Sequence, residues 1–172
     1  GRTGEFVAGV TSDLPEQVKV VILTPGDPDG LRRQVQALRR RNLTVLLETT
    51  CLEEALLGEE VGVDGLIAKG HEAGGRVMEE TTFILLQRLL ARVSLPIFAQ
   101  GGIGLHTAAA CYAAGAAGVV LDAQLALTRE SPLSEAVRAV IARMDGSETI
   151  CLGGELGEAY RVYARPGLPA VE

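Results

Sequence analysis

Short apolar runs alternate with helical patterns along most of this sequence, and this alternation restricts the possible folds more than any other feature. The apolar runs predict strands, and the segments between them have helical spacing. The predicted strands are Phe6–Val10, Val18–Thr24, Thr44–Glu48, Gly65–Lys69, Ile97–Gln100 and Val119–Asp122. The predicted helices are Asp29–Arg41, Leu52–Val61, Glu80–Val93, Leu105–Ala114 and Ser134–Met144. This order indicates an α/β protein with a parallel sheet.

The predicted strands are continuously apolar, as the runs VVIL, TVLL, GLIA and GVVL illustrate. Such strands are typical of parallel sheets that helices cover on both faces. The repeat fits either an open doubly wound sheet or a (β/α)8 TIM barrel. Because a complete barrel needs about 250 residues, a barrel here would be an incomplete fragment that lacks its first strands. The first residue is Gly1 rather than methionine, which supports that expectation.

The sequence also predicts how the chain is divided and which side of one helix is buried. Residues 1–146 would form the barrel portion, and residues 147–172 an irregular extension or linker in which YRVYARPG could hold a short strand. The helix at Glu80–Val93 has an apolar stripe that predicts its buried side. This stripe consists of Phe83, Leu86, Leu90 and Val93.

The composition excludes several classes of function. A net charge of −6 and a pI near 5.0 argue against a nucleic-acid surface. No apolar run approaches the roughly 20 residues that a membrane-spanning helix needs. Three widely spaced cysteines without a CxxC motif favour neither a disulfide framework nor a zinc site, so we expect a cytoplasmic setting. Two histidines without a carboxylate cluster make a catalytic metal unexpected.

Glycines and polar residues follow most of the predicted strands, at the end where parallel α/β proteins bind their ligands. After Ile97–Gln100, Gly101 and Gly102 allow the backbone to approach a ligand closely, and the next helix presents free N–H groups and its positive dipole end. This pattern predicts a phosphate site, with a plain tight turn as the alternative. The G-x-G at Gly102 and Gly104 also permits a dinucleotide site, although the third glycine of that fingerprint is absent.

The stretch GLIAKGHEAGG, residues 65–75, combines ionisable groups with paired glycines. Strand alternation places Lys69 on the same face as Gly65, where it could neutralise a phosphate or an anionic flavin ring, or extend into solvent. His71 and Glu72 are candidates for acid–base chemistry, with a surface position favoured for the histidine. The paired glycines Gly74 and Gly75 indicate a loop that passes close to something flat or bulky.

Three segments resemble, in order and spacing, the nitronate monooxygenase (2-nitropropane dioxygenase) family of FMN-binding TIM barrels. They read GVDGLIAKGHEAGGR, LPIFAQGGI and GAAGVVLDA, and the resemblance covers most of residues 43–132. It implies an FMN-dependent oxidoreductase whose phosphate is held by the backbone after the last two strands. The cofactor-binding residues under this interpretation are Lys69, Gly74, Gly75, Gln100, Gly101, Gly102, Ile103, Ala123 and Gln124.

Two residues depart from the family pattern. Arg76 stands where the family has its catalytic histidine, and a guanidinium cannot act as a general base. Asp122 and Ala123 replace a Gly-Thr pair, which brings a carboxylate near the expected phosphate. Similar departures occur in barrel domains of polyketide and polyunsaturated fatty acid synthases, where flavin reduces an enoyl thioester. Arg76 would there orient an acyl-carrier ligand or a pantetheine phosphate.

Three functions therefore stay open. One is a nitronate monooxygenase-like enzyme that acts on a small molecule. Another is an enoyl reductase that acts on an acyl thioester, with the other domains of a multienzyme as its partners. The last is a barrel without catalysis that serves as a docking domain.

Overall fold

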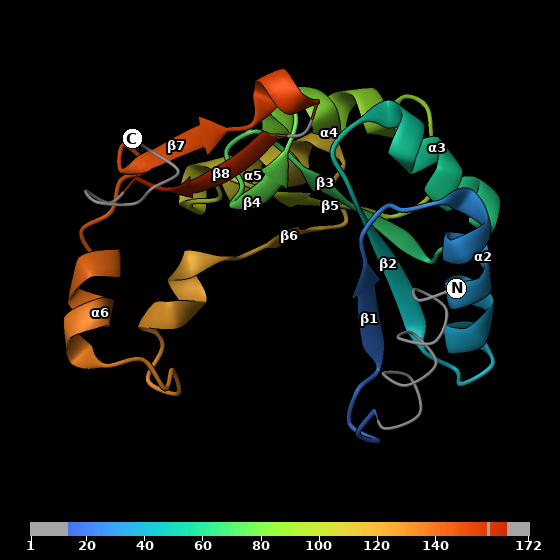
Figure 1. The fold of residues 1–172 in the computed structure, drawn as a ribbon, viewed down its shortest axis with the longest axis horizontal. Helices are drawn as coiled ribbons and strands as arrows, with labels where there is room; N and C mark the ends of the chain where they lie inside the picture. Colours follow the sequence, from blue (N-terminus) through green and yellow to red (C-terminus); the bar gives the residue numbers. More distant parts are fainter. Residues whose placement is uncertain (1–13, 158, 165–172) are drawn as a thin grey trace.

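A computed structural model describes residues 14–157 and 159–164 (Figure 1). Its larger sheet has five parallel strands in the order β1-β2-β3-β5-β6. They are β1 (Val20–Leu23), β2 (Thr44–Thr49), β3 (Gly65–Lys69), β5 (Ile97–Gln100) and β6 (Gly118–Val120). The connecting helices are α2 (Pro28–Arg39), α3 (Leu52–Val61), α4 (Thr82–Leu90) and α5 (Leu105–Ala114). The strand predicted at Phe6–Val10 lies outside the described residues.

The strand order distinguishes the two predicted architectures. In a doubly wound sheet the order reverses at a switch point, which places helices on both faces. Here neighbouring strands follow chain order, and the sheet bends into an arch with the helices on its outer side (Figure 1). This is the wall of a (β/α)8-type barrel, as predicted, and the doubly wound alternative is wrong. Within the described residues the sheet ends at β1 and β6 and does not close.

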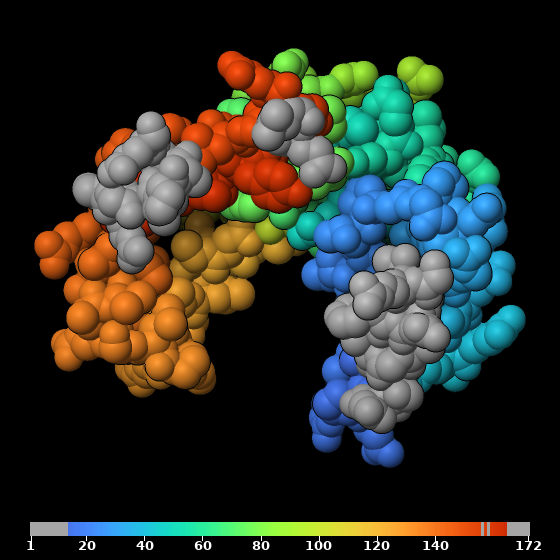
Figure 2. Space-filling model, in the orientation of Figure 1, coloured from blue at the N-terminus to red at the C-terminus, as the bar shows by residue number. Residues whose placement is uncertain are grey.

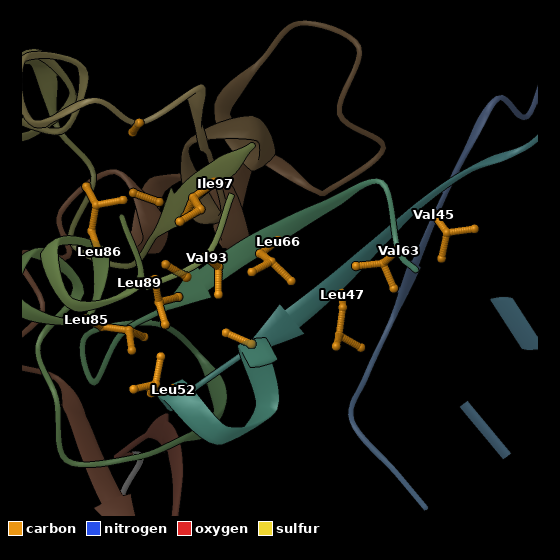
Figure 3. Close-up of a cluster of buried hydrophobic side chains, with 14 of the residues drawn as sticks. Val45, Leu47, Leu52, Val63, Leu66, Leu85, Leu86, Leu89, Val93 and Ile97 are labelled. Carbon is orange, nitrogen blue, oxygen red and sulfur yellow. The ribbon is translucent and has the colours of Figure 1, made fainter. Parts of the chain in front are cut away.

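The hydrophobic core lies between this wall and its helices (Figure 3). Alternate residues of each strand point outward into it, and strand register aligns them across the sheet. Burying each large side chain contributes about 1.5–3 kcal/mol. The core includes Leu31, Val35 and Leu38 of α2, Val45 and Leu47 of β2, Leu66 of β3, Leu85, Leu86 and Leu89 of α4, and Ile97 of β5.

The inner face of the sheet is only partly covered. Val20 and Ile22 of β1 are 49% and 50% exposed, whereas every residue of β3 is buried. The space-filling view shows this concave side open between the β1 end of the arch and α6 (Glu135–Ile141) (Figure 2). The expectation that helices cover both faces is therefore wrong, because all four connecting helices pack on the outer side.

The helix boundaries follow local signals. Asp27 caps α2, its Oδ1 accepting a hydrogen bond of 2.7 Å from Gly30 N–H, and Pro28 occupies the first turn. Helix α3 ends at Gly62, whose φ of 82° is the left-handed conformation that glycine adopts easily. The ranges of β3, β5, α3 and α5 match their predictions, and the other predicted elements differ by a few residues at their ends.

The predicted buried stripe of α4 is partly wrong. Phe83 is 42% exposed, and the helix runs from Thr82 to Leu90 rather than from Glu80 to Val93. The buried residues of the helix are Thr82, Leu85, Leu86 and Leu89, so the prediction is confirmed for Leu86 and, just beyond the helix, for Val93. The segment is apolar on two neighbouring faces, so its pattern alone permits either face to be the buried one. Packing against β3 and β5 selects the face that is buried.

The segment after Gly146 is more regular than predicted. It contains β7 (Thr149–Leu152), the 3-10 turn η2 (Gly154–Leu156) and β8 (Ala159–Tyr163), and the strand expected in YRVYARPG is confirmed. Both strands join β4 (Gly75–Val77) in an antiparallel sheet of order β4-β8-β7. The assignment of residues 147–172 to a separate extension stays a prediction. No helix in the described ranges is long and apolar enough to cross a membrane.

Candidate functional site

The turn after β5 is built from glycines that cannot be replaced without strain. Gly101 and Gly102 have φ angles of 113° and 61°, in the region that favours glycine. A Cβ on Gly101 would lie 2.7 Å from Thr82 Oγ1 and 2.8 Å from Ala73 N. The backbone therefore passes tightly between α4 and the loop after β3, where no side chain fits.

Backbone donors are available at this turn. Among the hydrogen bonds between described residues, none uses the N–H of Gly102 or Ile103. Thr107 holds the turn in shape, since its Oγ1 accepts a 2.7 Å hydrogen bond from Gly104 N–H and lies 2.9 Å from Gly102 O. Helix α5 begins directly afterwards, with its positive dipole end at the turn. Together these features suit an anionic ligand group.

The turn opens into a pocket of about 740 Å³, within the range of small-molecule and cofactor sites. Its walls come from the loops after β3, β5 and β6 and from the antiparallel sheet. The residues from the loops include Glu72, Gly74, Gly101, Gly102, Ile103, Asp122, Ala123 and Gln124. The sheet and its approach add Asp145, Thr149, Arg161, Val162 and Tyr163.

Six of the nine predicted cofactor residues line this pocket: Gly74, Gly101, Gly102, Ile103, Ala123 and Gln124. Lys69, Gly75 and Gln100 are not among the residues that line it. Lys69 is 8% exposed, and its Nζ pairs with Glu48 Oε2 at 3.2 Å. A Cβ on Gly75 would lie 3.6 Å from Lys69 Nζ, so the two residues are neighbours. The structure brings the predicted residues together, and their role in binding a cofactor stays a prediction.

Two glutamines hold the segment around Asp122 in place, since Asp122 N–H also donates to Gln124 Oε1 at 3.2 Å. Gln100 Nε2 donates a 2.8 Å hydrogen bond to Asp122 Oδ1, and Gln124 Nε2 donates one of 2.6 Å to Ile103 O. Gln100 is 7% exposed, and its Oε1 has no hydrogen-bond partner among the described residues. A buried acceptor without a partner is costly unless a ligand satisfies it. The unused N–H donors at the turn fit the phosphate of FMN.

Arg76, at the expected catalytic position, is engaged by α3. Its Nη2 donates to Glu54 Oε1 at 2.5 Å, and its Nη1 donates to Thr50 Oγ1 at 3.2 Å. Glu54 Oε2 also accepts a 2.7 Å hydrogen bond from Thr50 N–H. The Arg76 and Glu54 side chains are 31% and 14% exposed. The guanidinium thus ties β4 to the start of α3.

The two candidate acid–base groups of the loop after β3 also make structural contacts. His71 Nδ1 lies 2.8 Å from Met78 O, so this nitrogen carries the proton and donates. Glu72 Oε2 accepts a 2.9 Å hydrogen bond from Thr82 N–H at the start of α4. Both side chains therefore stabilise the loop that forms one wall of the pocket.

A second pocket, of about 480 Å³, lies where β7 and β8 meet the loops after β2 and β3. Cys51, His71 and Cys151 line it, together with Glu53 and Glu80. Burial raises the pKa of the Cys51 thiol, and neighbouring Glu54 and Glu53 carboxylates add to this shift. At neutral pH the thiol therefore stays protonated and a weak nucleophile. No group of three or more His, Cys, Asp or Glu residues in the described ranges could hold a metal ion.

Sequence reasoning missed the contribution of the C-terminal strands to the pocket. Arg161 lies 90 residues from His71 in the chain, yet its Nε donates a 2.7 Å hydrogen bond to His71 O. The only local signal was the alternation in YRVY, which predicted a strand but not its partner.

The fold and the pocket define a class: a barrel-type α/β protein with a glycine turn for an anionic group at the strand ends. The family model described as nitronate monooxygenase matches residues 2–163, and the chain belongs to this family. The resemblance found in the sequence is thereby confirmed.

Individual relatives agree with this assignment. A probable nitronate monooxygenase of Staphylococcus aureus (strain JH9) is 26% identical over 168 residues, covering 91% of this chain and 47% of the relative. The structure of FabK from Thermotoga maritima superposes with a TM-score of 0.78 at 30% identity, covering 88% of this chain and 48% of that one. A nitroalkane oxidase from Streptomyces ansochromogenes gives a TM-score of 0.71 at 26% identity, covering 91% and 47%. The chain spans about half the length of these relatives.

Proposed function

We propose that this protein is an FMN-dependent oxidoreductase of the nitronate monooxygenase class. One observation carries the proposal: in a member of this family, the unused N–H groups of Gly102 and Ile103 meet the α5 N-terminus at the edge of a pocket of about 740 Å³. Backbone donors at a helix N-terminus are a common phosphate site. When bound, FMN would supply the redox chemistry, and the protein would bind and orient it.

The chain's own residues would divide the binding work. Gly102 and Ile103 would donate to the phosphate, with Ala123 and Gln124 lining the opposite loop. The charge of Lys69 is balanced by Glu48, so its contribution to a flavin would be weaker than its sequence position suggests.

Arg76 limits the reactions that fit. A guanidinium stays protonated, and the ion pair with Glu54 holds it in place, so it would not remove a proton from a substrate. This favours substrates that need no base at that position. A nitronate is already deprotonated, so its oxidation by a nitronate monooxygenase-like enzyme needs no such base.

Reduction of an enoyl thioester is the second candidate, and the same observation at Arg76 favours it, because that reaction needs no side-chain base to deprotonate the substrate. The partners would then be an acyl thioester and other domains of a multienzyme of the polyketide or fatty acid type. That arrangement, the cytoplasmic location and the inactive docking barrel all stay predictions.

The first test is whether the purified protein holds flavin. We expect absorption bands of bound FMN in the visible spectrum, or saturable quenching of FMN fluorescence on titration. A protein that is folded by circular dichroism and binds no added FMN would overturn the proposal.

Activity then distinguishes the two reactions. Oxygen consumption with a nitronate supports the monooxygenase, whereas reduced-nicotinamide-dependent loss of an enoyl thioester supports the reductase. If a flavin-loaded protein shows neither activity, that result favours the docking barrel.

A further inference from the structure

The charges of the pocket are unbalanced among its described residues. Three carboxylates line it, those of Glu72, Asp122 and Asp145, and Arg161 is the basic residue of the lining. An anionic ligand in such a pocket would be repelled unless a cation offsets the carboxylates. Lys69 is close by but is already paired with Glu48. Arg161 is therefore the cation in the described lining that is available to an anion.

The position of Arg161 is fixed by two hydrogen bonds to neutral groups. Its Nε donates to His71 O at 2.7 Å, and its Nη1 donates to Thr149 Oγ1 at 2.9 Å. Within the described part of the chain, no carboxylate forms an ion pair with it, and its Nη2 makes no hydrogen bond. A half-buried guanidinium without a counter-ion is costly, since its charge is only partly solvated.

The contacts also place Arg161 near the glycine turn. Glu72 follows His71, and a Cβ built on Gly102 would lie 3.5 Å from the Cβ of Glu72. In the antiparallel sheet Arg161 stands opposite Gly75, a neighbour of Lys69. The loop after β3 therefore contacts both Arg161 and the glycine turn, and the two line the same pocket.

We propose that Arg161 supplies the positive charge that neutralises the phosphate of the bound flavin nucleotide. This inference rests on the proposed function and extends it, because it assigns a cofactor residue to the C-terminal antiparallel sheet. Guanidinium groups suit phosphate oxygens because their N–H donors form charge-assisted hydrogen bonds. Backbone N–H groups of the turn would hold the phosphate from one side and Arg161 would hold it from another.

The test compares two ligands that differ only in the phosphate. FMN and riboflavin are titrated into the purified wild-type protein and into Arg161→Gln and Arg161→Lys, with flavin fluorescence as the readout. For Arg161→Gln we expect FMN affinity to fall about 10-fold to 100-fold, as for a lost charge-assisted hydrogen bond. Riboflavin affinity should stay within about twofold, and Arg161→Lys, which keeps the charge, should bind FMN at an intermediate level.

Arg143→Gln is the matched control, because it removes an exposed arginine outside the pocket lining and should leave both affinities unchanged. Circular dichroism and thermal unfolding confirm that each variant is folded. An equal loss of FMN and riboflavin affinity in Arg161→Gln would mean that the residue only positions the loop, and would overturn the inference. Unchanged FMN affinity would overturn it too. A wild-type protein that binds neither flavin contradicts the proposed function itself, and this inference with it.

Discussion

The strand ends of β2 and β3 differ from those of β5 and β6 in how their polar groups are used. At β2 and β3 the charged groups pair within the protein: Lys69 with Glu48, and Arg76 with Glu54. After β5 and β6 the chain offers glycines, unused N–H groups and neutral amides. We call the first region the ion-paired side and the second the glycine side.

The difference explains why charge is a poor guide to the site in this protein. The ion-paired side contains the residues that look most reactive in the sequence, yet their partners already satisfy them. The glycine side has few reactive side chains, and among the described residues the N–H groups of Gly102 and Ile103 make no hydrogen bond. A ligand gains most from donors and acceptors that have no other partner in the folded state. Substitutions in the two regions should therefore differ in kind, with loss of binding on the glycine side and loss of stability on the ion-paired side.

A substitution on the glycine side should have the strongest effect, and this effect should be on FMN affinity. Gly102→Asp should reduce FMN affinity by more than about 100-fold, because it places a carboxylate beside the proposed phosphate site. Gly102→Asn is the matched control, since asparagine has nearly the same shape and both residues tolerate a positive φ. Isothermal titration measures both. Wild-type affinity in the aspartate variant would show that the phosphate binds elsewhere.

The ion-paired side should respond in stability rather than in binding. Glu54→Ala removes the ion pair with the partly buried Arg76 guanidinium and the acceptor for Thr50 N–H. We expect the free energy of unfolding to fall by about 2–3 kcal/mol in urea titrations. FMN affinity of the folded variant should change less than threefold, as an order-of-magnitude expectation.

Glu53→Ala serves as the control for this variant, since its side chain is exposed and lies one residue away. It should leave stability close to that of the wild type. If Glu54→Ala instead weakened FMN binding as much as Gly102→Asp, the distinction between the two regions would be lost.

The smallest effect is expected away from the strand ends, at the ion pair between Asp64 and Arg39. Burial alone would raise the pKa of Asp64, but the hydrogen bond from Val45 N–H and the Arg39 guanidinium outweigh it and lower the pKa. Because the folded pKa lies below the unfolded value of about 3.9, the carboxylate stabilises the fold above that pH. This contribution is lost as the pH falls through the folded pKa.

Asp64→Asn should therefore lower the free energy of unfolding by about 1 kcal/mol at pH 7. The deficit relative to wild type should shrink as the pH is lowered toward 3. Urea unfolding across this range measures the difference, with Asp29→Asn as the control because that carboxylate is exposed. A deficit that is constant with pH would mean that the charge of Asp64 does not stabilise the fold.

Much of the fold could be predicted because its signals are local. The ranges of β3 and α3 were predicted without error, since apolar runs and a terminal glycine mark their boundaries. The buried face of α4 could not be predicted, because two apolar stripes overlap in its sequence. The open inner face of β1 could not be predicted either, since an apolar run does not reveal which of its two faces a helix covers.

The candidate site divides in the same way. The glycine turn could be predicted, because paired glycines between a strand and a helix indicate a turn with positive φ angles. The partners of Arg76 and Arg161 could not, because they lie 22 and 90 residues away in the chain. Nothing in the local sequence pattern indicated that Glu54 would form an ion pair with Arg76 or that β8 would line the pocket.

The sequence by itself determined the repeat of strands and helices, the family and the glycine turn after β5. These features depend on periodicity and on the backbone freedom of single residues, which neighbouring positions specify. The tertiary structure alone decided which charged groups are paired and which remain available to a ligand. That outcome depends on contacts between segments far apart in the chain, because an ion pair forms wherever folding brings the two side chains together.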